Sequence, residues 1–469
     1  MQNEENQPVS LETISSLAKR RGFVYQTSEI YGGLANSYDY GPLGTELLLN
    51  IKSLWWDFFI RRREDMLGLD SQIILHPQTW VASGHVNSFT DPLVEDKVTH
   101  KRYRADSLIE DYFAKNPEKQ GEVIIANLST AELDDLINKH QIKSPDGNPL
   151  TEAQDFNILF ETAIGVLADK KNQVYLRGET AQGIFSNFKQ ILNSTRNKLP
   201  FGVGQIGKSF RNEITTGQFV FRTLEFEQGE IEYFFDPEKE DWQKLFKDWQ
   251  NQMWDFVTKV LGIREENLRW RRHTDKERSH YSQETYDLEY RYPFGWKELW
   301  GIAYRGDYDL KQQQEFSKQS LEYIDPQTNK KFLPHVIEPA AGINRLFLML
   351  LCDAYREDSD KERTVMAFKP KLAPYQLAVF PLLKNKEELV KKAREVYEQL
   401  NQKFRATWDE RGNIGKRYLS QDEIGTPFCI TIDFDTLEDK AVTVRHRDSS
   451  QQERIAITEL DNYLSSMLA

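Results

Sequence analysis

Apolar and polar positions divide the chain into segments of different character, and the first clear element lies near the N-terminus. Residues 43–60 are apolar on nearly every side of a helix, with leucine, tryptophan and phenylalanine throughout. A helix without a wet face has to be covered on several sides. The pattern therefore predicts a buried helix, covered by its own domain or partly by a second subunit.

The middle of the chain changes character several times. Residues 101–153 are polar, with two modest helical patterns and a turn at 144–149, and they look like an insertion into a larger core. Residues 157–235 show strand and turn patterns. Residues 242–261 carry large apolar side chains at helical spacing, which predicts an amphipathic helix packed on the core.

Strand and helix patterns alternate in the C-terminal part of the chain. From about Ala373 the order is strand, amphipathic helix, strand, short helix, two strands and a final helix, which is typical of a separate α/β domain. The predicted division is a core of residues 1–100 and 154–370 with an insertion at about 238–300, a second insertion at 101–153, and a C-terminal domain at 371–469.

Composition and charge narrow the function classes. The 469 residues, 39% of them hydrophobic, are enough for several domains with their own cores. A net charge of −12 argues against indiscriminate nucleic-acid binding, because a polyanion is repelled at long range, but local basic clusters allow selective binding. The two cysteines, Cys352 and Cys429, are too few for a disulfide framework or a cysteine-rich zinc site, so no structural zinc is expected.

The chain offers no pattern for membrane association. Its N-terminal residues lack the apolar core of a signal peptide, and its most apolar stretch is far shorter than a membrane span. We therefore expect a cytoplasmic protein that has no membrane contact.

A glycine-rich stretch at residues 202–209 fits two incompatible nucleotide motifs. It matches both the phosphate-loop spacing G-x-x-x-x-G-K-[ST] and the dinucleotide spacing G-x-G-x-x-G. Each motif needs a helix directly after the glycines, whose amides hold the phosphates. Residues 210–235 instead mix aromatic and charged positions around a turn at 215–217, which predicts a β-hairpin. The glycines are therefore interpreted as positions of close backbone packing beside a sheet.

The hairpin carries charged residues on both faces. Arg222, Glu230 and Glu232 are expected on one face, and Glu225 and Glu227 on the other. A solvated sheet would keep its polar residues on a single face. The pattern favours strands that line a ligand site, and an exposed hairpin held by ion pairs is the alternative.

A second unusual segment comes at residues 335–351. We expect a strand that ends at Pro339, followed by an apolar helix with Arg345 in its first turn. A cation near a helix N-terminus opposes the helix dipole. An anionic ligand beside Arg345 would explain the arginine, and a salt bridge with a neighbouring acid is the simpler alternative.

These two segments, in this order after the long apolar helix, resemble the second and third signature motifs of class II aminoacyl-tRNA synthetases. Within that class, "RGFVYQTSEIYGGLANSYDYGPLG", "RGETAQGIF", "LPFGVGQIGKSFRNEI" and "PFGWKELWGIA" resemble the homodimeric glycyl-tRNA synthetase family, and the resemblance runs from about residue 10 to the C-terminus. It implies an α+β protein: an antiparallel-sheet catalytic core with helical insertions, plus a C-terminal α/β anticodon-binding domain. The basic clusters near Lys416 and Arg445 would sit in that domain.

The resemblance also implies an activity and its partners. The family activates glycine with ATP to glycyl-adenylate and transfers the glycine to the 3′ end of tRNA(Gly), so the implied partners are glycine, ATP with Mg²⁺, tRNA(Gly) and a second copy of the chain. Catalysis then rests on alignment and on stabilising negative charge at phosphorus, for which arginine is well suited. The implied catalytic residues are Arg211 at the α-phosphate, Glu213 at the adenine amino group, and Arg345 at the adenine or the γ-phosphate.

Further site residues follow from the same resemblance, with Phe226 stacked on the adenine and Glu298 as the Mg²⁺ ligand. The implied ATP-binding positions are Arg211, Asn212, Glu213, Phe221, Arg222, Thr223, Leu224, Glu225, Phe226, Glu298, Leu299, Gly342, Ile343, Asn344 and Arg345. The implied glycine-binding positions are Arg104, Glu179, Phe226, Glu227, Gln228, Gly229, Glu230, Arg305, Glu338, Pro339, Ala340, Ala341 and Gly342.

Three alternatives to this interpretation differ in class: a non-catalytic homologue, a synthetase for serine, threonine or proline, and a phosphate-loop NTPase. The chain also departs from the family at Gly178, Leu224 and Ala340, where proline, arginine and serine are usual. All three implied catalytic residues are nevertheless present, which favours an active enzyme.

Overall fold

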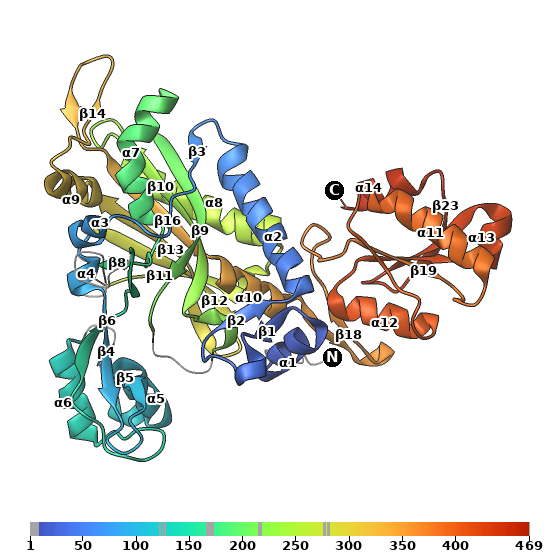
Figure 1. Ribbon diagram of the computed structural model, residues 1–469, viewed down its shortest axis with the longest axis horizontal. Helices are drawn as coiled ribbons and strands as arrows, with labels where there is room; N and C mark the ends of the chain where they lie inside the picture. The colour runs from blue at the N-terminus through green and yellow to red at the C-terminus, as the bar shows by residue number, and fades with distance from the viewer. Residues whose placement is uncertain are drawn as a thin grey trace.

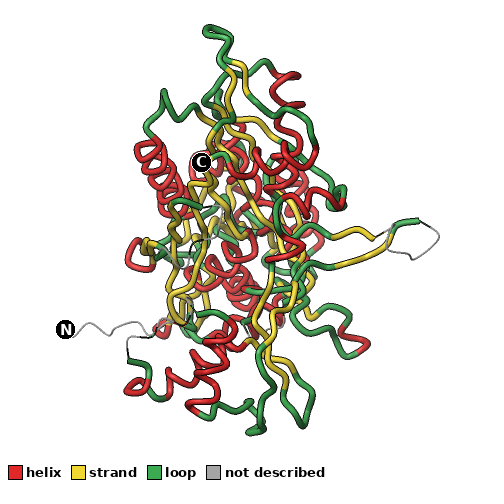
Figure 2. The backbone as a smooth tube through the Cα atoms, turned by 90° about the vertical axis from the view of Figure 1, so that its left-hand side faces the viewer, coloured by secondary structure: helices red, strands yellow, loops and turns green. Residues whose placement is uncertain are grey.

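The computed structural model describes residues 9–468, except 122, 124, 126–127, 166–172, 214–217, 275–277 and 279–281. The chain forms a large central body, a small insertion at lower left in Figure 1, and a C-terminal domain at right. The side view in Figure 2 shows helices flanking the strands on both sides. None of the described helices is both long and apolar enough to cross a membrane.

A seven-stranded sheet organises the central body. In spatial order its strands are β11 (Leu268–Arg272), β12 (Glu284–Tyr292), β13 (Gly295–Gly306), β16 (His335–Gly342), β10 (Glu225–Phe235), β9 (Phe201–Phe210) and β3 (Met66–Gly68). All neighbours are antiparallel except β3 and β9. The second half of the range 238–300, expected as an insertion, thus belongs to this sheet, because β12 and β13 pair along their length and β13 continues the ladder to β16.

One face of the sheet is covered by the long apolar helices. These are α2 (Pro42–Trp56) with its π-helical extension η2 (Asp57–Arg61), α8 (Trp242–Asp255) with its extension η7 (Phe256–Leu261), and α10 (Ile343–Ala354). Phe59 illustrates their packing, since its ring centroid lies 5.4 Å from that of Trp55 and 5.3 Å from that of Trp300. The helices predicted at 43–60 and 242–261 are confirmed.

The opposite face is covered by a helix that was missed in the sequence. Residues 157–235 were interpreted as strands and turns, yet α7 (Ala181–Thr195) lies among them. Its Phe185 and Phe188 are fully buried against the sheet residues Phe201 and Phe234. The apolar positions of this segment repeat at helical spacing, and that local signal decides the structure.

Short elements complete the central body. They are α1 (Leu11–Arg21), β1 (Val24–Gln26), η1 (Glu29–Tyr31), β2 (Tyr38–Tyr40), α3 (Pro77–Ala82), α4 (His85–Ser88), β7 (Glu161–Ala163), β8 (Gln173–Tyr175), η6 (Phe219–Phe221), η8 (Glu265–Asn267), α9 (Tyr308–Ser317), β14 (Tyr323–Ile324), β15 (Lys331–Phe332), β17 (Tyr355–Asp358), η9 (Ser359–Lys361) and β18 (Arg363–Met366).

The glycine-rich stretch lies within strand β9 and is not a nucleotide loop. Its strand pairs antiparallel with β10, and the described residues directly after it, 211–213, form no helix. A Cβ atom on Gly204 would lie 2.2 Å from Ile60 Cδ1, and one on Gly207 would lie 2.2 Å from a guanidinium nitrogen of Arg177. Close packing therefore accounts for the glycines, as expected. The turn predicted at 215–217 lies outside the described residues.

Two details of the signature segments differ from expectation. Arg222 precedes β10 and does not share a strand face with Glu230 and Glu232. Strand β16 does not end at Pro339 but continues to Gly342, because the residues after the proline still pair with both neighbouring strands. Helix α10 therefore begins directly at the end of the strand.

The insertion has its own sheet and core. Strands β5 (Arg102–Arg104), β4 (Thr90–Glu95) and β6 (Gln154–Asn157) form its sheet in that order, and α5 (Ala105–Lys115), η3 (Pro117–Lys119) and α6 (Thr130–His140) complete it. Both predicted helices are confirmed, and a hydrogen bond of 3.0 Å from the Ser144 amide to the Asn148 carbonyl closes the predicted turn.

The C-terminal domain carries a five-stranded mixed sheet. Its strands, in spatial order, are β20 (Ala406–Trp408), β19 (Leu377–Pro381), β21 (Phe428–Ile432), β22 (Ala441–His446) and β23 (Gln452–Ala456). Its helices are α11 (Glu387–Asn401), α12 (Ile414–Ile424), α13 (Phe434–Asp439) and α14 (Leu460–Leu468). The predicted alternation is confirmed, and α13 and β23 are additional elements.

Candidate active site

A cavity of about 260 Å³ lies over strands β10, β13 and β16, beside the start of α10. It is lined by sixteen of the residues implied by the family resemblance. They are Glu179, Arg211, Glu213, Phe221, Arg222, Thr223, Phe226, Glu227, Gln228, Glu230, Glu298, Glu338, Ala340, Gly342, Asn344 and Arg345. The two signature segments and their flanks thus meet at one place.

The other implied residues do not line the cavity. Side chains alternate between the two faces of a strand, so Leu299 and Ala341 point into the hydrophobic core, which Ile343 also joins. Each of the three is the chain neighbour of a residue that does line the cavity, namely Glu298, Ala340 or Gly342, and its side chain therefore points to the other side. The remaining non-lining positions are Arg104, Asn212, Leu224, Glu225, Gly229, Arg305 and Pro339.

Arg211 lines the cavity and lies between two aromatic rings. Its guanidinium carbon lies 5.0 Å from the ring centre of Phe89 and 5.2 Å from that of Phe226, and its Nε donates a 3.0 Å hydrogen bond to the Gly178 carbonyl. Within the described part of the chain, no carboxylate forms an ion pair with it. Arg211 is therefore a positioned cation in need of an anion.

Arg345 has the acidic partner that the alternative explanation required. One of its guanidinium nitrogens lies 2.8 Å from a Glu298 carboxylate oxygen and also donates a 3.0 Å hydrogen bond to the Glu298 carbonyl. Its guanidinium carbon lies 4.5 Å from the Phe221 ring centre. Burial alone would raise the pKa of Glu298, but Arg345, together with Arg211 and His273, outweighs burial, so the pKa is lowered and the pair is ionised.

Three buried glutamates also line the cavity. Glu230 on β10 and Glu338 on β16 are both buried, as is Glu179 just before α7. Burial, together with neighbouring carboxylates, raises the pKa of Glu230 to about 8 and that of Glu338 to about 7. Burial also acts on Glu179, but His85, whose Nε2 lies 3.3 Å away, and Arg305 outweigh it and lower the pKa of Glu179.

The two arginines implied at the glycine site are both held by acids. Arg104 contacts Asp91 and Asp106, each at 2.6 Å. Arg305 is almost completely buried and makes two hydrogen bonds to Asp309, at 2.7 and 2.8 Å, as well as one to Glu338. Arg305 therefore reaches the cavity through Glu338 and not directly.

Comparison with known proteins agrees with this geometry. Residues 160–354 match the family model of the tRNA synthetase class II core domain (G, H, P, S and T), and residues 376–467 match that of the anticodon binding domain. The glycine–tRNA ligase of Staphylococcus haemolyticus is 52% identical over 467 residues, which cover 98% of this chain and 99% of that protein. The chain belongs to the glycine–tRNA ligase family.

Other family members match to a similar extent. The glycine–tRNA ligase of Acetivibrio thermocellus is 50% identical, with 97% of each chain covered, and that of Clostridium acetobutylicum is 49% identical, with 98% and 99% covered. Prolyl-tRNA synthetase of Cryptosporidium parvum has a similar fold, with a TM-score of 0.63 at 14% identity over 97% of this chain and 77% of that one. The family and the class II fold expected from the sequence are confirmed.

Several residues of the cavity were missed in the sequence. They are His273, Thr285, Asp287, Gly301, Ile302 and Ala303. All but His273 lie on β12 and β13, and His273, Thr285 and Asp287 fall inside the range 238–300 that was interpreted as an insertion. The folded chain brings them together, since Asp287 lies opposite Gly301 in the ladder and His273 Nε2 lies 2.8 Å from the Asp287 carboxylate.

The basic clusters of the C-terminal domain are mostly structural. Arg445 makes two hydrogen bonds to Asp422, at 2.7 and 2.8 Å, and Arg447 donates to the Gly425 and Phe368 carbonyls. Arg417 is equally buried, whereas Lys416 is exposed. Sequence alone did not separate these buried arginines from a nucleic-acid surface.

Proposed function

We propose that this chain is a working glycine–tRNA ligase that forms and then uses glycyl-adenylate. A carboxylate oxygen of glycine attacks the α-phosphorus of ATP, and pyrophosphate leaves. A hydroxyl of the 3′-terminal ribose of tRNA(Gly) then attacks the carbonyl carbon of the adenylate, and AMP leaves. The observation that carries the proposal is the single cavity that joins Arg211 and Arg345 to a buried set of carboxylates.

Arg211, Arg345 and the aromatic residues beside them would hold ATP. Arg211, fixed between Phe89 and Phe226, would contact the α-phosphate as negative charge accumulates there in the transition state. Phe226 would stack on the adenine, and the Glu213 carboxylate would accept a hydrogen bond from the adenine amino group. Arg345 would lie on the other side of the base or at the γ-phosphate. Neither step needs a covalent bond to the protein.

Two carboxylates of the cavity suit a magnesium ion. Glu298 and Asp287 both line it, and carboxylate oxygens are the ligands that Mg²⁺ prefers. We propose that Glu298, with Asp287 beside it, holds Mg²⁺ together with the ATP phosphates. The bound ion would neutralise phosphate charge, while the protein residues hold the nucleotide in place.

The buried glutamates of the cavity would hold the ammonium group of glycine. Glu230 and Glu338 would accept its hydrogen bonds, and Arg305 would orient Glu338 through their ion pair. Amino acids with a side chain would be rejected by the crowded walls, because a steric clash discriminates more strongly than the ~1–3 kcal/mol that one methylene contributes in an accommodating pocket.

Assembly and partners complete the proposal. The C-terminal domain would bind the anticodon arm of tRNA(Gly) in the cytoplasm. A homodimer would cover the apolar surface near η1, where Ile30 and Tyr31 are 87% and 86% exposed. Light scattering coupled to size-exclusion chromatography tests the dimer, and a monomer at micromolar concentration would contradict it.

Amino-acid-dependent exchange of pyrophosphate into ATP tests the activity. We expect glycine alone, among the standard amino acids, to support exchange. Equal exchange with alanine or serine would overturn the glycine assignment, and no exchange with any amino acid would overturn adenylate formation.

A further inference from the structure

Glu232 is a buried acid for which the reaction gives no role. It lies on β10, two residues after Glu230 and on the same face of the strand, and its exposed fraction is 0%. Neither of its carboxyl oxygens receives a hydrogen bond from any donor in the described part of the chain. It does not line the cavity, whereas Glu230 and Glu338 do.

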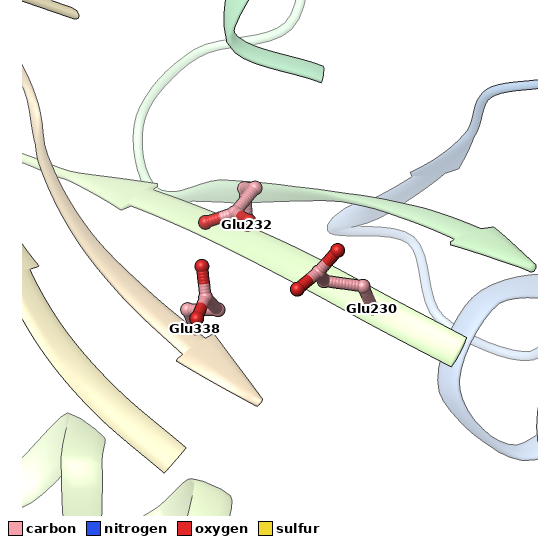
Figure 3. Close-up of side chains that lie close together, drawn as sticks. All are labelled: Glu230, Glu232 and Glu338. Atoms are coloured by element: carbon pink, nitrogen blue, oxygen red, sulfur yellow. The ribbon is translucent and has the colours of Figure 1, made fainter. Parts of the chain in front are cut away.

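The carboxyl groups of Glu230, Glu232 and Glu338, here called the carboxyl cluster, face one another. One oxygen from each lies within 4.8 Å of the other two. Figure 3 shows Glu232 and Glu338 reaching towards each other from neighbouring strands, with Glu230 beside them. Glu232 thus faces another carboxyl group, that of Glu338, where a buried carboxylate would usually face a cation.

Among the residues that the structure describes, no cation forms an ion pair with Glu232. The charged groups closest to it and to the rest of the cluster are Glu230 on β10, Arg305 on β13, Glu338 on β16, Asp309 on α9, Glu179 before α7, and His85 on α4. Arg305 binds Asp309 and Glu338, and His85 lies against Glu179. Burial, followed by Glu338, raises the pKa of Glu232 well above its usual value. An isolated buried carboxylate is very costly, so Glu232 holds a proton.

We propose that Glu232 is a positioning residue of the amino-acid site: as a neutral acid it donates a hydrogen bond to Glu338 and holds that carboxylate ready to accept the ammonium group of glycine. The inference rests on the proposed function, since it concerns the same site. Two ionised carboxylates cannot hydrogen-bond to each other, whereas a protonated acid is both a donor and an acceptor.

The donor role has a consequence for the charge of Glu338. A hydrogen bond from Glu232 favours the ionised form of Glu338 and is among the influences that lower the pKa of Glu338 against the effect of burial. Without that donor, Glu338 would take up a proton at higher pH and lose its capacity to accept from an ammonium group.

Three clustered carboxyl groups also have the composition of a divalent cation site, which is the competing explanation. Two of them already receive hydrogen bonds, Glu230 from the Thr180 hydroxyl and Glu338 from Arg305. The cation that the cluster lacks is supplied by the ammonium group of glycine itself. Titration with MnCl₂ alone, without nucleotide, separates the two explanations.

Two substitutions in the full-length protein test the role. Glu232→Gln keeps a neutral donor of the same length, so the KM for glycine should stay within about threefold of the wild-type value. Glu232→Leu removes the donor and should raise that KM by about tenfold to a hundredfold, the range for a hydrogen bond to a charged group. The KM for ATP should change little in either variant. Glu232→Met replaces the leucine variant if the latter does not fold.

The pH profile distinguishes positioning from a structural role. In Glu232→Leu the acidic limb of kcat/KM for glycine should move to higher pH by about one unit or more, because Glu338 has lost its donor. An unchanged KM and profile in this variant would overturn the proposal. Equal impairment of the glutamine variant would overturn it too, as would Mn²⁺ binding that both substitutions abolish.

Failure of the proposed function gives a different result. If the wild-type protein catalyses no glycine-dependent exchange, the proposed activity is refuted, but the role of Glu232 is not. Equilibrium dialysis with radiolabelled glycine and no ATP then still tests Glu232, because the expected order of affinity is wild type, glutamine variant and leucine variant.

Discussion

Two groups of buried charges in this protein differ in how they are neutralised. Between the central body and the C-terminal domain, Asp422 on α12 accepts hydrogen bonds from Arg363 at 2.7 Å and from Arg445 at 2.7 and 2.8 Å. Arg363 also binds Asp358, and Arg447 is capped by main-chain carbonyls. Each of these charges has a partner, whereas no cation of the described residues forms an ion pair with Glu230 or Glu232 in the carboxyl cluster.

The difference distinguishes a structural network from a binding site. Removing one member of a matched network leaves uncompensated charge, so such networks fix how elements are joined. A cluster that is short of cations is destabilising on its own and persists where a ligand supplies the missing charge. Sequence alone did not make this distinction, because arginines and glutamates of both kinds occur in similar local patterns.

The largest expected effect comes from breaking the matched network. Asp422→Ala would leave Arg363 and Arg445 buried without their shared partner, which should destabilise the C-terminal domain by about 3–5 kcal/mol. Thermal unfolding followed by circular dichroism measures it. Asp439→Ala is the matched control, since Asp439 pairs with Arg454 at the surface of the same domain, and its unfolding midpoint should hardly move. Equal midpoints for the two variants would contradict the structural role.

Arg211→Ala should have the next largest effect, on the rate of adenylate formation. Arg211 is the one arginine lining the cavity for which no acidic partner is found among the described residues, and its contact with phosphate would strengthen in the transition state. Losing one such contact typically costs about 10²–10³ in rate, or roughly 3–4 kcal/mol. Single-turnover formation of glycyl-adenylate by the folded variant measures it, and a near-normal rate would refute the mechanism.

The sequence predicted much of this architecture because its strongest signals are local. The apolar helices α2, α8 and α10, the C-terminal alternation of strands and helices, and the β9–β10 hairpin all follow from spacing within short windows. The central sheet did not follow in full, because β13 joins it by pairing with β16, whose paired residues are thirty or more positions away in the chain, and β12 joins it through β13. Long-range pairing has no local signature.

The active site likewise contains residues that local motifs identified and residues that only the folded structure revealed. The residues of the two signature segments were found through their family resemblance. Asp287 on β12 and His273, which directly follows β11, were missed because both lie in the range that was interpreted as an insertion. Glu232 was placed on the correct face of its strand, but its importance depends on what surrounds it. Burial and missing partners are properties of the folded chain and not of any motif.

The number of protons released on glycine binding reports how many carboxyl groups of the cluster are protonated in the empty site. Because the pKa of Glu230 is raised to about 8 and that of Glu338 to about 7, the empty site carries protons at neutral pH. An ammonium group needs ionised acceptors, so glycine binding should release protons, and affinity should fall as the pH drops, by up to about tenfold per unit for each proton released. Calorimetry at about pH 7 in two buffers of different ionisation enthalpy measures it. Identical binding heats in both buffers would contradict the protonated empty site.

The smallest effect is expected at Lys208, the lysine of the apparent phosphate-loop motif. Its ammonium group pairs with Glu225 across the β9–β10 ladder, and the two side chains are 52% and 50% exposed. An exposed pair of this kind contributes about 0–1 kcal/mol, so Lys208→Ala should leave both stability and the rate of adenylate formation close to wild type. The phosphate-loop interpretation requires the reverse order, with Lys208 essential and Arg211 dispensable. The same single-turnover assay, performed on both variants side by side, therefore decides which of the two cations binds phosphate. A rate loss in Lys208→Ala as large as that in Arg211→Ala would contradict the interpretation of β9 as a sheet strand without a role in nucleotide binding.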